Sequence, residues 1–183
     1  MHAEARHSFG NVITPNRVDN DVRAFLASAS KAGDDRFVLG FCADLRDNGI
    51  VDPFCVELET NTLAQYHDEQ KAIRVLSQVL EAGIDEFLAK QVRLDRSLIA
   101  LRVNEPSFVE KDIEALPSSD EATPEIGAKM VALLCEDGRL ADAAEYAYTL
   151  FRRYPHDHIT HMAVIRSLGL GTGQEVELPR IDV

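Results

Sequence analysis

Three of the six histidines of this chain fall within six consecutive residues, at His156, His158 and His161. Neutral imidazole is the commonest metal ligand near neutral pH. On a helix, His158 and His161 would lie three positions apart on one face, so both rings could reach the same ion. A metal-dependent enzyme built on these three histidines is therefore one hypothesis for the chain.

The His-x-His-x-x-His spacing is similar to part of the metallo-β-lactamase motif, with two departures. Thr160 stands where that family has an acidic ligand before the last histidine, and a helix ends at Pro155 where that family has a strand. Asp157 is typical of a helix N-cap rather than of a ligand. We therefore expect solvated turn residues with one packed histidine, and we assign no metal ligand in the favoured interpretation.

Other chemistry lacks a sequence signature. The chain contains no GxSxG elbow, no phosphate-binding GxxxxGK[ST] loop and no GxGxxG after a strand, and its acidic runs lack calcium-loop spacing. The cysteines, Cys42, Cys55 and Cys135, form no CxxC pair, so we interpret them as small buried apolar residues in a reducing compartment. We expect no cofactor, no catalytic residue and hence no enzyme.

The net charge of −12 disfavours a nucleic-acid partner, because most affinity for nucleic acid comes from basic residues that neutralise phosphates. Arg93, Arg96 and Arg102 could form a local basic patch, but Asp95 and Glu105 dilute it. No run approaches the roughly 20 apolar residues that span a bilayer. The N-terminus also lacks the apolar core of a signal peptide. We expect a cytoplasmic protein without membrane insertion. The amino-acid composition is typical of a bacterial protein.

Apolar residues recur at helical spacing along most of the chain, which predicts an all-α fold. The first helix should begin at an N-cap Asn20 or Asp21, the second at Asp34, and a third at Asp52 followed by Pro53. Residues 50–66 stay ambiguous between helix and strand. The clearest helix of the first half covers 68–82, and three more are expected at 124–136, 140–154 and 157–169.

These elements divide the chain into four stretches. We expect a flexible lead-in over 1–19, a helical region over 20–116, a helical hairpin with a capping helix over 117–170, and an extended tail over 171–183. The end of that tail alternates enough for a short C-terminal strand, although Pro179 favours an edge position. The architecture predicted is therefore a set of stacked antiparallel helical hairpins.

Small residues recur at fixed places between residues 124 and 157. Gly138 falls at a turn, Ala143 and Ala147 lie on the following helix, and Pro155 follows that helix. In these places the segment resembles a tetratricopeptide repeat, a 34-residue helix–turn–helix. Its first helix departs from the pattern, because Gly127, Met130 and Val131 occupy the aromatic and leucine-glycine places and Leu134 occupies the tyrosine place.

The resemblance implies an α-solenoid in which the first helices of successive units line a concave surface. Such a surface would bind a helix or peptide of another protein, in an adaptor, a chaperone-like protein or an accessory subunit, and a homo-oligomer stays open. Upstream the repeat frame is poor, so the first half is at best a degenerate array. The residues implied to line the surface are Glu125, Ala128, Ala132, Cys135, Glu136, Met162 and Arg166.

Overall fold

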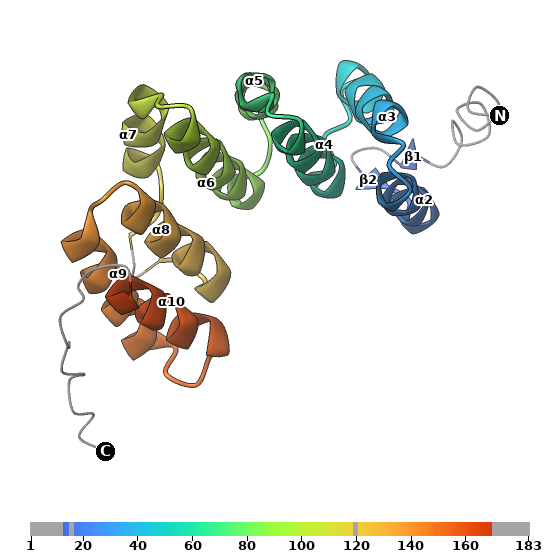
Figure 1. Ribbon diagram of the computed structural model, residues 1–183. Coiled ribbons are helices and arrows are strands. Elements are labelled where there is room, and N and C mark those ends of the chain that lie inside the picture. Colours follow the sequence, from blue (N-terminus) through green and yellow to red (C-terminus); the bar gives the residue numbers. More distant parts are fainter. Residues whose placement is uncertain (1–12, 15–16, 119–120, 170–183) are drawn as a thin grey trace. The chain divides into compact units, whose positions relative to one another are not determined.

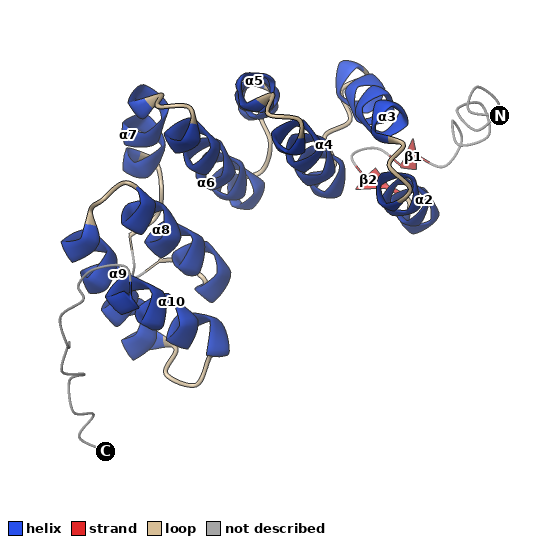
Figure 2. Ribbon diagram, in the orientation of Figure 1, coloured by secondary structure: helices blue, strands red, loops and turns tan. Residues whose placement is uncertain are grey.

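The computed structural model describes residues 13–14, 17–118 and 121–169 of the chain. The described chain is built almost entirely of helices (Figure 1, Figure 2), which confirms the predicted all-α class. It divides into two compact units, residues 1–92 and 93–183, each with its own internal contacts. Within the described ranges, no helix is both long and apolar enough to cross a membrane.

The first unit begins with two short strands, β1 (Ile13–Thr14) and β2 (Arg17–Val18), which pair in antiparallel fashion. The helices of this unit are α2 (Asn20–Lys31), α3 (Asp35–Asp47), α4 (Pro53–Gln65) and α5 (Glu69–Glu81). Helix α6 (Glu86–Arg102) carries the chain from the first unit into the second. The sequence showed no periodicity over residues 1–19, so the strand pair was not predicted.

Three of the helix starts in this unit test the capping predictions. Asp34 caps α3 and Asp52 caps α4, with Pro53 in the first turn, so both predictions are confirmed. The prediction for α2 was wrong: Asp19 is the N-cap, and its carboxylate accepts a hydrogen bond of 2.9 Å from the backbone N–H of Asp21. The backbone of Asp19 is extended, as an N-cap residue requires, whereas Asn20 and Asp21 already lie within the helix.

Helix α4 resolves the stretch that the sequence left ambiguous. It buries residues on several sides, including Glu59, Thr60 and Thr62, so it lacks a single apolar stripe. The Thr60 and Thr62 hydroxyls donate to the carbonyls of Val56 and Leu58, four residues back in the same helix, at 2.8 and 2.7 Å. These bonds satisfy buried hydroxyl groups without any partner from another element. The alternation in sequence therefore reflects a largely buried helix rather than a strand.

The core of the first unit is continuous from β2 to α4. Asp52 is 1% exposed, and its carboxylate accepts hydrogen bonds from the Val18 N–H at 3.1 Å and from Arg23 at 2.6 Å. One buried acid thus holds the strand pair, α2 and the start of α4 together. The buried members of this cluster are Val18, Val22, Leu26, Phe37, Val38, Phe41, Cys42, Leu45 and Cys55.

The second unit contains the last part of α6 together with α7 (Pro106–Glu114), α8 (Pro124–Glu136), α9 (Leu140–Arg153) and α10 (His158–Gly169). The three last helices fall within one residue of the predicted ranges, which confirms those predictions. Helix α10 packs against both α8 and α9, and α8 packs against α9. The tail, with its predicted C-terminal strand, lies outside the described residues.

Candidate functional site

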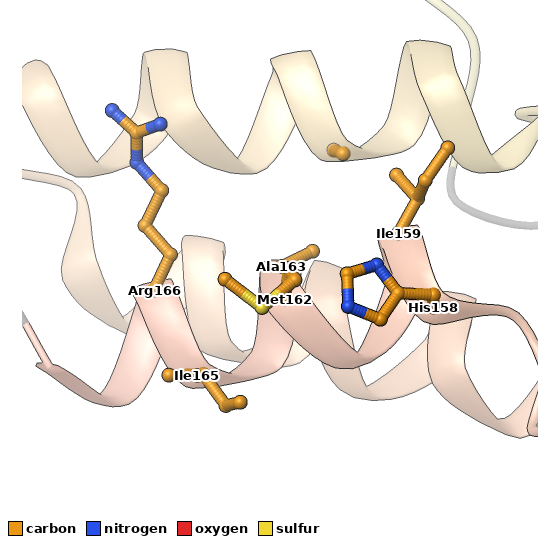
Figure 3. A pocket seen from close by; sticks show the side chains of 7 residues that line it. His158, Ile159, Met162, Ala163, Ile165 and Arg166 are labelled. Atoms are coloured by element: carbon orange, nitrogen blue, oxygen red, sulfur yellow. The ribbon is translucent and has the colours of Figure 1, made fainter.

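A hollow in the second unit lies between α8 and α10. Its volume is about 570 Å³, and the residues that line it are Ala128 from α8 and His158, Ile159, Met162, Ala163, Ile165 and Arg166 from α10 (Figure 3). Five of these seven side chains are apolar, while His158 and Arg166 can carry positive charge. The hollow is therefore a shallow apolar surface with basic groups on it.

The position of α8 depends on a small residue facing α9. Gly127 lies so close to Leu150 that a Cβ atom on Gly127 would come within 2.6 Å of the Leu150 Cδ2 atom. Leu150 is fully buried, so its side chain could not move away into solvent. The start of α8 is fixed by Thr123, which caps the helix, and by Pro124 in the first turn. The α8–α9 contact thus sets where Ala128 stands.

The position of α10 depends on the turn that follows α9. The Thr160 hydroxyl is fully buried and donates to the carbonyls of Tyr154 and Asp157, at 2.8 Å each. The Asp157 carboxylate accepts a hydrogen bond of 3.1 Å from the Thr160 N–H, as expected for an N-cap. These bonds fix the direction in which α10 leaves the turn, and with it the face that α10 turns toward α8.

Along α10 the side chains divide into two groups. Ile159, Ala163 and Arg166 point toward α8, whereas Ile165 points away from it (Figure 3). Met162 is 50% exposed and Ile165 is 60% exposed. Large apolar side chains with this exposure, next to one another on a helix, are typical of a surface that a partner covers. The described part of α10 therefore presents an uncovered apolar edge.

Arg166 closes one end of this surface. Its guanidinium donates to the Glu136 carboxylate of α8 at 3.1 Å, and both side chains are largely exposed. Burial raises the pKa of the nearby Cys135 thiol, and the positive charge of Arg166 offsets part of that effect. Cys135 is therefore a protonated, buried thiol at neutral pH and has no feature of a reactive nucleophile.

The seven residues that the repeat resemblance placed on this face take different positions. Ala128, Met162 and Arg166 line the hollow, and Glu136 pairs with Arg166. Glu125 is exposed, whereas Ala132 and Cys135 are each only 7% exposed. Four of the seven residues therefore lie at or beside the hollow between α8 and α10, and two lie in the interior.

Sequence reasoning missed Ile159 and Ile165 as members of the surface. The buried residues of α10 are Thr160, Ala163 and Ser167, so Ile165 lies outside the buried face of that helix. A threonine and a serine on the buried face hide the apolar periodicity that would have shown the correct phase. Both hydroxyls donate to backbone carbonyls, Ser167 to that of Val164 at 2.8 Å.

The three histidines of the cluster do not converge. His156 is exposed, His158 faces the hollow, and His161 Nε2 lies 2.8 Å from the Pro155 carbonyl oxygen, to which it donates as the Nε2–H tautomer. The His161 ring also packs against Phe151, with centroids 5.1 Å apart. Among the described residues, no group of three histidine, cysteine or acidic side chains is placed to hold a metal ion.

The basic patch considered in the sequence loses Arg96, which lies in the interior. Arg96 is 7% exposed and binds the Asp112 carboxylate through Nε at 2.9 Å and through its terminal nitrogen at 2.5 Å. Its guanidinium also lies 5.1 Å from the centre of the Phe108 ring. Arg96 is thus a structural link between α6 and α7, and a phosphate group could not reach it without breaking that link.

Comparison with protein-family models, with curated proteins and with solved structures finds no match to this chain. Among α8, α9 and α10, the features that suit a function are the exposed apolar side chains of α10 and the basic groups beside them.

Proposed function

We propose that α8, α9 and α10 form a tetratricopeptide-like hairpin with a capping helix, and that the hollow between α8 and α10 binds an apolar segment of another protein. The chain would then act as an adaptor, a chaperone-like protein or an accessory subunit. The observation that carries the proposal is the exposure of Met162 and Ile165 beside a hollow whose polar members are His158 and Arg166.

The packing of the hairpin supports a repeat-like arrangement. Ala143 and Ala147 are fully buried on α9, as expected where two helices approach closely. The α8–α9 turn contains Gly138 in a left-handed conformation (φ 79°), which suits glycine because it has no Cβ atom. Where the repeat pattern has an aromatic residue, this chain has Gly127, and the side chain of Leu150 fills the space. The departure from the pattern is thus compensated within the hairpin.

The exposed side chains support binding over catalysis. Met162 and Ile165 would lose their remaining contact with water when a partner covers them, and because each is already about half buried, each contributes roughly half of the ~1.5–3 kcal/mol of full burial. Apolar anchors in a concave surface with a polar border are the usual composition of a binding hot spot.

The charges around the hollow favour a partner segment with acidic groups. His158 and Arg166 lie eight residues apart on α10, which corresponds to roughly 12 Å along a helix. An acidic side chain of the partner would compete with Glu136 for Arg166, an exchange between two exposed carboxylates with little cost in desolvation. A short helix or an extended peptide with apolar residues between acidic ones fits this spacing.

The proposal is tested by affinity capture from cells that naturally produce the protein. We expect Met162→Asp/Ile165→Asp to lose partners that the wild-type chain retains, because two carboxylates would have to be buried without a compensating charge. Phe87→Asp is the matched control, since Phe87 is 55% exposed at the start of α6 in the other unit. Circular dichroism should show equal helix content in all three proteins. Equal recovery of every partner by the double variant would contradict the proposal.

A further inference from the structure

Two cysteines meet in the core of the first unit. Cys42 lies on α3 and Cys55 in the first turn of α4, two helices that pack against each other (Figure 1). Both are free thiols, 2% and 4% exposed, and both belong to the same apolar cluster. Cys55 is the largest single influence on the raised pKa of the Cys42 thiol, so the two side chains lie within interaction range of each other. This pairing could not be predicted from the sequence, because the two residues form no CxxC motif.

The surroundings lower the reactivity of the Cys42 thiol while the helices stay closed. The neighbouring Cys55 side chain, burial and the nearby Glu59 carboxylate raise the pKa of Cys42 well above its usual range, and the Arg46 guanidinium opposes this only in part. A protonated thiol is a poor nucleophile. Reaction with an oxidant therefore requires the α3–α4 hairpin to open, which makes its rate a measure of that opening.

We propose that Cys42 and Cys55 form a thiol–disulfide site, at which a peroxide links α3 to α4 covalently. Peroxide first oxidises one sulfur to a sulfenic acid, as its O–O bond breaks and one water leaves. The second thiol then attacks that sulfur, the S–O bond breaks, and the thiol proton leaves with the hydroxide as a second water. The two sulfurs together lose two electrons, and the peroxide gains them.

The shared burial of the two thiols favours this reaction over oxidation of a single thiol. A disulfide requires a separation of about 2 Å between the sulfurs, and the two thiols belong to one buried cluster on helices that pack against each other. Once formed, the bond would join the two sides of the α3–α4 hairpin and oppose its opening. Cys135, the third cysteine of the chain, lies on α8 in the other unit and provides an internal control.

Mass spectrometry of the full chain tests the site. Hydrogen peroxide is added, the remaining thiols are alkylated, and the digest is mapped without reduction. We expect a Cys42–Cys55 linked peptide whose mass is lower by two hydrogen atoms and which dithiothreitol restores, while Cys135 is recovered alkylated. In Cys42→Ser the link should disappear. A higher melting temperature of the oxidised chain, reversed by dithiothreitol, is the second expected result.

A second experiment addresses the case in which peroxide reaches the closed hairpin too slowly for the link to form. The reaction is repeated in glutathione redox buffer, followed to equilibrium, with urea below the unfolding transition to accelerate opening. The link should form faster with urea. Full alkylation of both Cys42 and Cys55 at equilibrium under these conditions would overturn the proposal. Preferential formation of disulfides through Cys135 would overturn it as well, because the pairing would then follow accessibility rather than the contact in the core.

Discussion

At the scale of single residues, Gly127 and Leu150 form a size-matched pair at the α8–α9 contact. Gly127→Ala should destabilise the second unit by about 1 kcal/mol, because overpacking costs about 1–3 kcal/mol and the gain in helix propensity returns only part of it. In a Leu150→Ala background, the same change should instead stabilise by roughly 1 kcal/mol, since the clash is gone and the propensity gain remains. Urea unfolding of the four proteins measures the coupling. Additive effects would show that the contact is not close.

Tyr146 gives the second unit a pH dependence at its alkaline limit. Burial raises the pKa of the phenol to about 12, and its hydroxyl donates to the Pro117 carbonyl at 3.1 Å. The folded state therefore retains the proton at a pH at which the unfolded state has lost it. The resulting stability is complete below the unfolded pKa of about 10 and is lost as the pH rises toward about 12.

We expect wild-type stability to fall more steeply than that of Tyr146→Phe between pH about 10 and about 12. Thermal unfolding of both proteins across this range provides the comparison, and the difference between the two slopes removes the contribution of other alkaline groups. Parallel slopes would mean that the phenol titrates alike in the folded and unfolded states.

Sequence reasoning predicted residue roles where the signal was local. An N-cap aspartate needs only its own next few residues, so Asp34, Asp52 and Asp157 could be recognised. Long-range pairing has no such signal. Nothing in the sequence connects Arg96 with Asp112, or places the His161 ring on the Pro155 carbonyl. The histidine cluster thus looked more like a metal site than its folded geometry permits.

At the scale of elements, α3 and α4 are joined by a buried ion pair. The Glu59 carboxylate is 3% exposed and accepts a hydrogen bond from Arg46. Burial raises the pKa of Glu59, and Arg46 offsets only part of the cost of ionising it. The pair is therefore more important for fixing the register of the two helices than for net stability, because a buried pair seldom exceeds its apolar equivalent.

Arg46→Met should destabilise the first unit by about 3–5 kcal/mol, because it leaves a buried carboxylate without its partner. The double variant Arg46→Met/Glu59→Leu should recover most of that loss, since no buried charge remains. Chemical denaturation of the wild type, both single variants and the double variant gives the coupling. A double variant as unstable as Arg46→Met would mean that packing, rather than charge, is responsible.

The elements themselves were predictable to the extent that each buries one face. Helix α5 has a single apolar stripe over Ala72, Val75, Leu76 and Val79, and its range was predicted within one residue. Helix α4, buried on several sides, gave an ambiguous pattern. In α10, Ile159 and Ile165 were missed as surface residues because Thr160 and Ser167 occupy the buried face and satisfy their hydroxyls on backbone carbonyls. Apolar periodicity cannot identify the buried face of a helix when that face carries polar residues whose hydrogen bonds are satisfied.

At the scale of the whole molecule, the chain combines a net charge of −12 with two compact helical units. The α8–α10 hollow of the second unit has two basic side chains, His158 and Arg166, beside its apolar ones. Each unit has its own internal contacts, so the unfolding of one need not accompany that of the other. The proposed binding surface belongs to the second unit.

The central claim, that α10 carries a partner-binding surface, is tested most directly by photo-crosslinking in the native cell. A photoreactive phenylalanine replaces Met162 in one protein and Tyr148, which is 45% exposed on α9, in another. We predict a discrete protein adduct from position 162 that is reduced by Arg166→Glu, and no such adduct from position 148. Absence of an adduct at 162, or the same adduct from both positions, would contradict the account.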